Sequence, residues 1–584
     1  VADLQAQLRH SPGGDGLFIL TETVTSPTLH DQLAAILARH PRARWHQYQP
    51  LDRGHVYEGA RLAWGEPLEP CYRYGDARVV VALDADVVGT MPGCVRHARD
   101  IADARRSDRA AQMSRLHVAE GTPSLTGALA DHRCVVRCGD IDALTQRLAA
   151  RLGVGAAPPG APASRARDDT KAGEVAWLDN VANDLTRNRG HAIVIAGDRQ
   201  PAAVHALVHA INHALDNDRL IELREPVAFE TGDGIESLRI LVDAMKSGHA
   251  TTLLILGGNP VYNAPRDLDF AAALGHVRWS AHHALYRDET SVACSWHVAA
   301  AHVLEDWGDV RAFDGSVTIQ QPCIAPLYDG KSAHEMLSVL LDGNPRPAHD
   351  VVRDFWQQRH PQDFDAFWRN ALQRGVVDEP SPPARTHVLH AMPATATTER
   401  ASTGVELVLT ADPTLGDGRH ANNAWLQELP KPITTLTWDN AALVSPDFAH
   451  AHDLANEDLV ELRTRDGRAL RAPVWIVPGH AGESVTLHLG FGRSRAGSVG
   501  NGVGVDAYAL FDSATRGVVN DIDVRKVDGR HRLAAAQTHG RMEGRDLVRI
   551  VTRDDATRCA SGGCEPAHAH DPRMLAEAVW TAVT

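Results

Sequence analysis

A glycine- and asparagine-bearing loop, Gly257–Pro265 (GGNPVYNAP), is the segment whose residue types best suit ligand binding. It directly follows Thr251–Leu256, a short apolar run typical of a buried strand. Its two glycines let a ligand approach the backbone, and its two asparagines offer amide donors and acceptors. The alternative is an ordinary turn in which Asn and Pro occupy turn positions. The residues expected at a ligand are Gly257, Gly258, Asn259, Pro260 and Asn263.

Three histidines, His205, His209 and His213, recur at every fourth position and therefore share one face of a predicted helix. Such an i, i+4 pair can bind zinc. However, the chain has 32 histidines, so this spacing arises easily by chance, and no Glu-x-x-His pattern joins the three. A solvated or partner-facing stripe is the favoured interpretation.

Cys559, Cys564, His568 and His570 form the one Cys/His cluster of the sequence. Four such groups can close a tetrahedral zinc site, but a Cys-x4-Cys gap is at the loose end of zinc-finger spacings. A flexible, metal-free tail is therefore the favoured interpretation.

The other cysteines do not form a redox site. The chain has eight cysteines and no CxxC pair, and the nearest approach elsewhere is Cys134 with Cys138. Iron–sulfur clusters need about four thiolates held close together, so no cluster is expected. Four lone cysteines are expected to be small buried hydrophobic residues: Cys71, Cys94, Cys294 and Cys323.

The elements that position these residues alternate between strands and helices up to about residue 375. This order predicts parallel sheets covered by helices on both faces. Beyond the polar segment 376–403, short strands and a tight Asp466-Gly467 turn predict a small β-barrel. We therefore expect an α/β chain with two doubly wound domains, a C-terminal barrel and a tail. The predicted bounds are 1–165, 166–385, 400–515 for the barrel, and 516–584 for an irregular tail.

Composition narrows the function further. The 584 residues are 43% hydrophobic and 23% charged, as in a soluble globular protein. A formal net charge of −15 argues against nucleic acid as a partner. Since no apolar run reaches the roughly 18 residues of a membrane span, the chain itself is not expected to be transmembrane. Val1 is not followed by a recognisable export signal, so no side of a membrane is predicted.

Six stretches of the chain, in order, resemble one family. This is the molybdopterin oxidoreductase (DMSO reductase-like) superfamily, and the similarity is greatest to the molybdopterin-like part of ActB, the iron–sulfur subunit of alternative complex III. The stretches are 18–30 (FILTETVTSPTLH), 113–133 (MSRLHVAEGTPSLTGALADHR), 256–270 (LGGNPVYNAPRDLDF), 288–317 (DETSVACSWHVAAAHVLEDWGDVRAFDGSV), 419–426 (RHANNAWL) and 538–548 (THGRMEGRDLV).

The resemblance implies a pterin crevice between the α/β domains and a barrel that resembles a molybdopterin-dinucleotide-binding domain. It adds Glu289, Thr290, Asn422 and Asn501 to the expected crevice residues, although a purely architectural role is favoured for Glu289-Thr290. Asp52 lies near the position at which some relatives place a carboxylate ligand to molybdenum, and it is a weak candidate for that role.

The resemblance also implies a function. Relatives carry a cysteine-cluster domain before this region and a ferredoxin-like domain after it, and this sequence has neither. We expect a scaffold subunit of a respiratory complex, peripheral to a bacterial inner membrane, with no cofactor of its own. Its partners would be an iron–sulfur (ferredoxin-like) subunit and membrane subunits. The alternative is an active molybdopterin (bis-MGD) oxidoreductase subunit whose iron–sulfur domain is on another chain. An ordinary nucleotide-binding enzyme ranks last, because no GxGxxG or GxxxxGK[ST] follows a strand.

Overall fold

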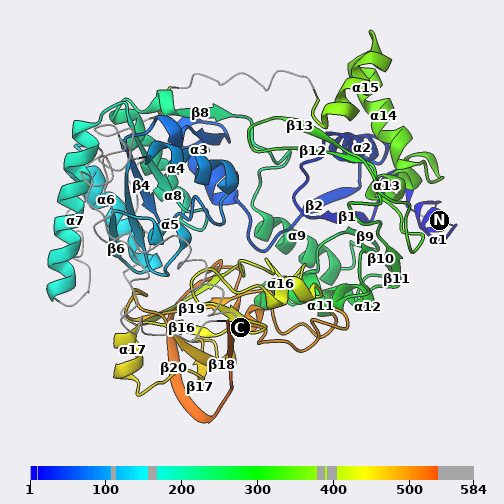
Figure 1. Ribbon diagram of the computed structural model, residues 1–584. Coiled ribbons are helices and arrows are strands. Elements are labelled where there is room, and N and C mark those ends of the chain that lie inside the picture. The colour runs from blue at the N-terminus through cyan, green and yellow to red at the C-terminus, as the bar shows by residue number, and fades with distance from the viewer. Residues whose placement is uncertain are drawn as a thin grey trace, which may run out of the picture.

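Two parallel sheets and a closed barrel make up the protein in the computed structural model (Figure 1). The structure describes residues 2–9, 11–106, 113–154, 168–377, 388–390 and 404–536. Within these ranges no helix is both long and apolar enough to cross a membrane.

The first sheet has four parallel strands in the order β6-β5-β4-β7, and its central strand β4 is buried throughout. Alternate β4 residues point to opposite faces, so Val79 and Val81 pack under α6, α7 and α8, whereas Val80 and Ala82 pack under α4. The strands are β4 (Val79–Leu83), β5 (Arg115–Glu120), β6 (His132–Val135) and β7 (Ala192–Ala196), and the helices are α4 (Cys94–Ala104), α5 (Leu125–Ala128), α6 (Ile141–Arg151), α7 (Asp168–Arg187) and α8 (Ala202–Ala214).

The second sheet has five parallel strands in the order β11-β10-β9-β1-β2. Ile19 of the interior strand β1 packs under α2 and α13 on one face, and Phe18 and Leu20 pack under α9 and α11 on the other. The strands are β1 (Leu17–Thr21), β2 (Arg44–Gln47), β9 (Thr252–Leu256), β10 (Trp279–Ala284) and β11 (Trp296–Ala299), and the helices are α2 (Pro27–Arg39), α9 (Gly234–Lys246), α11 (Phe270–Leu274) and α13 (Ala333–Asp342).

The two sheets are interleaved in the sequence, so the boundary predicted at residues 165/166 does not separate them. β1 pairs with β9, and β7 pairs with β4, in both cases across the predicted boundary. Strand–helix alternation indicates that strands are parallel, but it does not indicate which strands are partners. The first sheet is therefore an insertion between β2 and β9 of the second.

The predicted barrel is present, and its strands close in the order β14-β19-β16-β18-β17-β20. The Asp466-Gly467 hairpin joins β17 to β18 as expected, and Gly467 has the left-handed φ of 90° that such a turn requires. The strands are β14 (Val405–Thr410), β16 (Ala442–Val444), β17 (Asp458–Arg463), β18 (Ala469–Ile476), β19 (Ser484–His488) and β20 (Val518–Arg530).

Strand β20 corrects the prediction of an irregular tail after residue 515. It pairs with both β14 and β17 and so closes the barrel. Its sequence, VVNDIDVRKVDGR, carries charges at its exposed positions and buries only Val519 and Ile522 completely. A long strand with one exposed face therefore has the composition of a polar tail.

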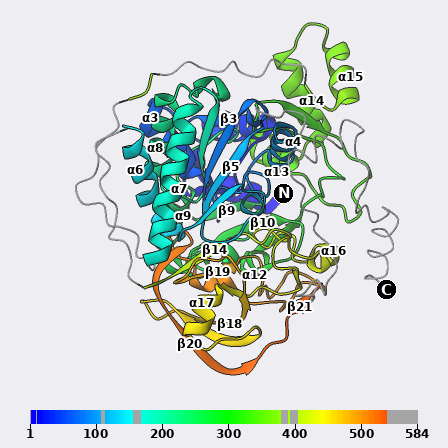
Figure 2. The ribbon, with the colours of Figure 1, turned by 60° about the vertical axis from the view of Figure 1, so that its left-hand side comes forward.

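Smaller elements complete the fold, and Figure 2 shows the barrel below the two sheets. One hydrophobic core runs without a break from β1, β9 and α9 into the barrel strands, whereas the first sheet has two cores of its own. The remaining elements used below are α3 (Gly54–Trp64), β3 (Glu69–Tyr72), β8 (Ile221–Arg224), α10 (Pro260–Asn263), α12 (Glu289–Ala293), β12 (Gly308–Arg311), β13 (Val317–Gln320), α14 (Ala348–Arg359), α15 (Phe364–Arg374), α16 (Ala424–Glu428) and α17 (Pro446–Ala451).

Candidate functional site

The predicted ligand loop begins where β9 ends, at the edge where parallel sheets commonly bind ligands. Gly257 and Gly258 have φ of 72° and 66°, a left-handed conformation that favours glycine. The buried side chain of Asn259 then turns toward α12. Its Nδ2 donates to Glu289 Oε2 at 2.8 Å, and its Oδ1 accepts from Thr290 Oγ1 at 2.7 Å. The structure therefore brings these three predicted residues together.

Glu289 joins this loop to the barrel. Its carboxylate accepts hydrogen bonds from the backbone N–H groups of Ser494 at 2.9 Å and Arg495 at 2.8 Å, and pairs with Arg493 Nη2 at 2.7 Å. Burial by itself would raise the pKa of Glu289, but the bond and charge of Arg493, together with Asn259, outweigh it and lower the pKa to about 2. The carboxylate is thus fully used within the protein.

The two barrel asparagines predicted at the crevice also bind the protein itself. Asn422 Oδ1 accepts from Val499 N at 3.0 Å, and Asn501 Oδ1 accepts from Gly497 N at 3.1 Å. A Cβ on Gly497 would lie 2.3 Å from Cγ of Asn422, so a glycine is required at this approach. Both side chains fix the shape of the loop that covers Glu289.

The space left beside the ligand loop is about 10 Å³. That volume suffices for roughly one water molecule. A second ion pair, Arg419 Nη2 with Glu22 Oε1 at 2.7 Å, closes the same region from the barrel side. Pro260 begins the short helix α10, and the backbone carbonyl of Asn263 accepts from Tyr48. The residues of this crevice do not fit a pterin, because their polar groups already bind one another and leave no room.

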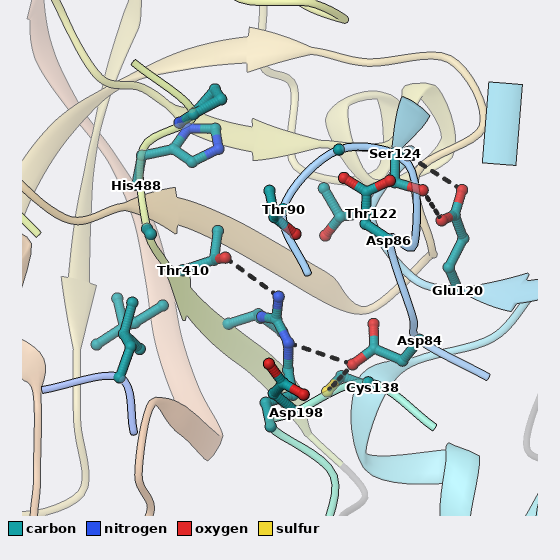
Figure 3. A pocket seen from close by; sticks show the side chains of 18 of the residues that line it. Asp84, Asp86, Thr90, Glu120, Thr122, Ser124, Cys138, Asp198, Thr410 and His488 are labelled. Carbon is teal, nitrogen blue, oxygen red and sulfur yellow. Dashed lines mark hydrogen bonds and ion pairs between the residues drawn. The ribbon is translucent and has the colours of Figure 1, made fainter. Parts of the chain in front are cut away.

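A second space, of about 460 Å³, lies at the carboxyl edge of the first sheet, facing the barrel (Figure 3). This volume falls within the range of small-molecule sites, about 300–1,000 Å³. The lining comes from the ends of β4, β5 and β7 and from barrel segments near residues 408–413, 431–434 and 488. Among the lining residues are Asp52, Asp84, Asp86, Glu120, Cys138, Asp198, Arg199, Thr410, Lys431 and His488.

Two acidic residues of this cavity have structural partners. Asp86 Oδ1 accepts from the backbone and side chain of Thr126, and Glu120 accepts from Ser124 and from Arg133 Nε at 2.7 Å. Burial raises the pKa of Glu120, and the bonds from Ser124 and Arg133 oppose that shift. These carboxylates hold the strand-end loops in place.

Asp52, the weak metal candidate, lies on the wall of the larger cavity. Its two oxygens accept backbone N–H groups, from Gly54 at 3.0 Å and Gly234 at 3.2 Å. Burial raises its pKa, and the Gly54 bond opposes the rise. Over the part of the chain that the structure describes, no group of three or more His, Cys, Asp and Glu side chains could hold a metal ion. Asp52 therefore connects two loops and belongs to no such group.

The three histidines of α8 were expected to face solvent or a partner, but the structure places them in a helix contact. His205 and His209 are buried, and His209 and His213 meet the ring of Trp64 edge-on, each with 5.9 Å between ring centroids. Burial, reinforced for His205 by nearby cations, lowers the pKa of His205 to about 3 and that of His209 to about 4. Only His213 is at the surface, paired with Asp218. The stripe is a helix-packing face, because the small residues of α3 leave room for imidazole rings.

The cysteines that the structure describes are unpaired and scattered. Cys134 and Cys138 are buried, and Cys71, Cys94 and Cys294 are partly buried. Cys323 is exposed, contrary to the expectation that it would be buried. The cluster at 559–570 lies outside the described residues.

The larger cavity was not predicted from the sequence, although acidic residues follow one of the strands that line it. β4 ends at Asp84-Ala85-Asp86, and Asp84 has a left-handed φ of 52°. Ligands commonly bind at the carboxyl ends of parallel strands, so the position of these two carboxylates after β4 made them candidates. Arg199 follows β7 at the same edge. No strand pattern could indicate that the barrel covers this edge and contributes Lys431 to the cavity.

Comparison with known proteins shows the fold. No protein-family profile matches the chain, and no curated protein is similar to it at a significant level. Among solved structures, acetylene hydratase from Pelobacter acetylenicus is similar, with a TM-score of 0.61 and 11% sequence identity over 90% of this chain and 88% of that chain. At this identity the likeness shows a shared fold alone, and it agrees with the α/β sheets and barrel that the sequence predicted.

Proposed function

We propose that this chain is a molybdopterin-oxidoreductase-like subunit of a respiratory electron-transfer complex of the alternative complex III type. In that complex it serves as a scaffold without a molybdenum or iron–sulfur centre of its own. The observation that carries the proposal is the closed crevice at Glu289. A ligand placed there would have to break an ion pair and two charge-assisted backbone bonds, each stronger than a neutral hydrogen bond.

An apolar surface at the edge of the second sheet supports the scaffold role. β11 is the last strand of that sheet, and its Trp296 is 49% exposed. Lys331 donates a backbone hydrogen bond to Ala299 at the end of β11, and the loop just before Lys331 presents Leu327 and Tyr328 at 68% and 87% exposure. Leu304 and Ile324 lie side by side there, joined by a backbone hydrogen bond of 3.1 Å. We call these five residues the edge patch, and we assign it to the iron–sulfur subunit.

The test begins with the native complex. The chain is purified from its source and analysed for co-purifying subunits, molybdenum, tungsten and pterin. We expect an iron–sulfur subunit and membrane subunits at stoichiometric amounts, and no metal or pterin assigned to this chain. A chain that runs alone and carries stoichiometric molybdenum with dye-linked turnover contradicts the proposal.

Variants then test the patch. Leu327→Glu places a charge in the edge patch, whereas Val175→Glu places one at a 45% exposed apolar position on α7, on the far side of the molecule (Figure 1). Stable interfaces bury more than about 1,000 Å² and exclude charges from their centre. We expect Leu327→Glu alone to lose the iron–sulfur subunit in a pull-down. Equal retention by both variants removes the patch from the proposal.

The second candidate is an active molybdopterin (bis-MGD) oxidoreductase subunit served by an iron–sulfur domain on another chain. The observation that favours it is the 460 Å³ cavity with Asp52 in its wall, since Asp52 would be the residue to hold a metal there. The closed crevice opposes it, because two pterins need two open crevices. Metal and pterin analysis separates the two candidates directly.

A further inference from the structure

The ammonium group of Lys431 is buried at the barrel end of the larger cavity. Its side chain is 3% exposed, yet it lines the cavity. Nζ lies 3.4 Å from Asp412 Oδ2 and 5.0 Å from the centre of the Phe491 ring, and no hydrogen bond to it is found within the described part of the chain. An ammonium can donate three hydrogen bonds, so Lys431 has unused donors at a cavity wall.

The counter-ion of Lys431 is held in place through its other oxygen, while Oδ2, which faces the lysine, makes no hydrogen bond within the described residues. Asp412 Oδ1 accepts from Thr414 N at 2.9 Å, Thr414 Oγ1 at 2.7 Å and Leu415 N at 3.0 Å, which fixes the carboxylate in its own turn. It therefore cannot move toward the lysine without breaking these bonds. A buried charge with incomplete hydrogen bonding is costly, and an anion in the cavity would relieve that cost.

A second cation lies in the wall of the same cavity. Arg199 Nε pairs with Asp84 Oδ2 at 3.2 Å, and Arg199 Nη2 donates to Thr410 Oγ1 at 3.1 Å (Figure 3). The guanidinium thus spans from the strand end to the barrel, and His488 lies on the barrel side of the same cavity (Figure 3).

Another part of the cavity lining favours hydrogen-bond donors. Asp198, at the end of β7, lies 3.7 Å from Arg53, and its Oδ1 has no hydrogen bond within the described residues. The barrel side of the wall is mainly apolar and includes Val408, Leu409, Pro413, Ile433, Leu443 and Val518. The cavity lining therefore combines a buried cation, an apolar wall and a hydrogen-bond acceptor.

We propose that this cavity binds a small organic anion. Its carboxylate or phosphate would bind Lys431, its apolar body would contact the barrel residues, and a hydroxyl or amine would reach Asp198. The proposal goes beyond the scaffold function and does not depend on it, because binding requires neither a metal nor a partner subunit.

Titration calorimetry on the purified full chain tests the proposal with three probes of one shape. These are 4-hydroxybenzoate, 4-hydroxyphenyl phosphate and the neutral 4-hydroxybenzyl alcohol. We expect at least one anion to bind about tenfold more tightly than the alcohol, and the better anion distinguishes carboxylate from phosphate. Equal affinity for all three, or binding of none, overturns the proposal.

Variants locate the site. Lys431→Met combined with Asp412→Asn removes the pair without leaving a lone buried charge, and Lys431→Arg keeps the cation. The matched control is Lys331→Met with Asp329→Asn, an exposed pair outside the cavity. We expect the Lys431 double variant to lose the preference for anions, and Lys431→Arg and the control to keep it. Thermal unfolding of each variant confirms that it is folded, and an unchanged anion preference in the folded double variant overturns the assignment to Lys431.

Discussion

At the scale of single residues, the side chains that were expected at a ligand mostly form hydrogen bonds and ion pairs with other parts of the protein. Glu289 is the clearest case, since it was expected at a cofactor crevice and instead binds Arg493 and two backbone amides of the barrel. Residue type and spacing placed Asn259, Glu289 and Thr290 in one neighbourhood. They could not indicate that the barrel loop occupies the space between them, because that depends on contacts over 200 residues apart in the chain.

The first prediction concerns how the contact between Glu289 and the barrel depends on pH. Glu289→Gln removes a charge whose pKa is lowered to about 2 in the folded protein, against 4.5 for an ordinary glutamate. Its stabilisation is present above about pH 4.5 and is lost as the pH falls toward 2. At pH 7 we expect the variant to lose about 3 kcal/mol of unfolding free energy, with the difference from wild type shrinking below pH 4.5.

Urea unfolding at pH 7, 5, 4 and 3 measures this difference. Glu58→Gln, an exposed glutamate paired with Arg61, is the control and should change stability by less than about 0.5 kcal/mol. If Glu289→Gln lowers the unfolding free energy by the same amount at every pH, the charge of Glu289 does not stabilise this contact.

The second prediction concerns His209, whose pKa burial lowers to about 4. In the unfolded chain this group takes up a proton below about pH 6.5, and in the folded protein only near pH 4, so stability falls as the pH drops through this window. His209→Gln should reduce the slope of unfolding free energy against pH by up to about 1.4 kcal/mol per pH unit. Unfolding at pH 7, 6 and 5 provides the slope, and His213→Gln on the same helix controls for losing a ring. An unaltered slope in His209→Gln would mean that the buried imidazole does not govern acid sensitivity.

At the scale of elements, sequence patterns found the strands and missed their partners. Short apolar runs between turns are a local signal, and the predicted run Thr251–Leu256 lies within one residue of β9. The sequence patterns did not indicate that the two sheets are interleaved, because each of these runs could pair with any other. β20 was missed for a different reason: one face of a long barrel strand is exposed, and its charges dominate the composition.

The third prediction tests the contact between α3 and α8. A Cβ on Gly59 of α3 would lie 2.4 Å from Cβ of His205 and 2.9 Å from the carbonyl oxygen of Ala202. Gly59→Ala should therefore destabilise the protein by about 1–3 kcal/mol through overpacking, despite the better helix propensity of alanine. Gly173→Ala on α7 is the matched control, because nothing lies within 4 Å of its added methyl group. The control should gain about 0.5–1 kcal/mol. If both variants gain stability, the two helices can separate at no cost.

At the scale of the whole molecule, the barrel is joined to the two sheets in different ways. It shares one continuous core with the second sheet, through Phe18 and Leu20 on one side and Leu407 and Leu409 on the other. The first sheet has cores of its own, and polar bonds join it to the barrel. Chief among them, Glu406 of β14 accepts the backbone N–H groups of Cys138 at 2.9 Å and Gly139 at 3.0 Å.

The last prediction follows from this asymmetry. Glu406→Ala leaves two buried N–H groups without their acceptor, at about 1–3 kcal/mol each, and weakens the junction that no apolar core supports. We expect its calorimetric trace to split, with the first sheet and its helices melting below the rest. Glu289→Ala weakens a junction that a shared core also holds, so it should lower the melting temperature and keep a single transition. Hydrogen exchange assigns the early transition, and it should fall on β4–β7. A single transition in Glu406→Ala would mean that the remaining bonds across the cavity, such as Thr122 to Thr486 and Arg133 to Gly479, suffice to couple the sheet to the barrel.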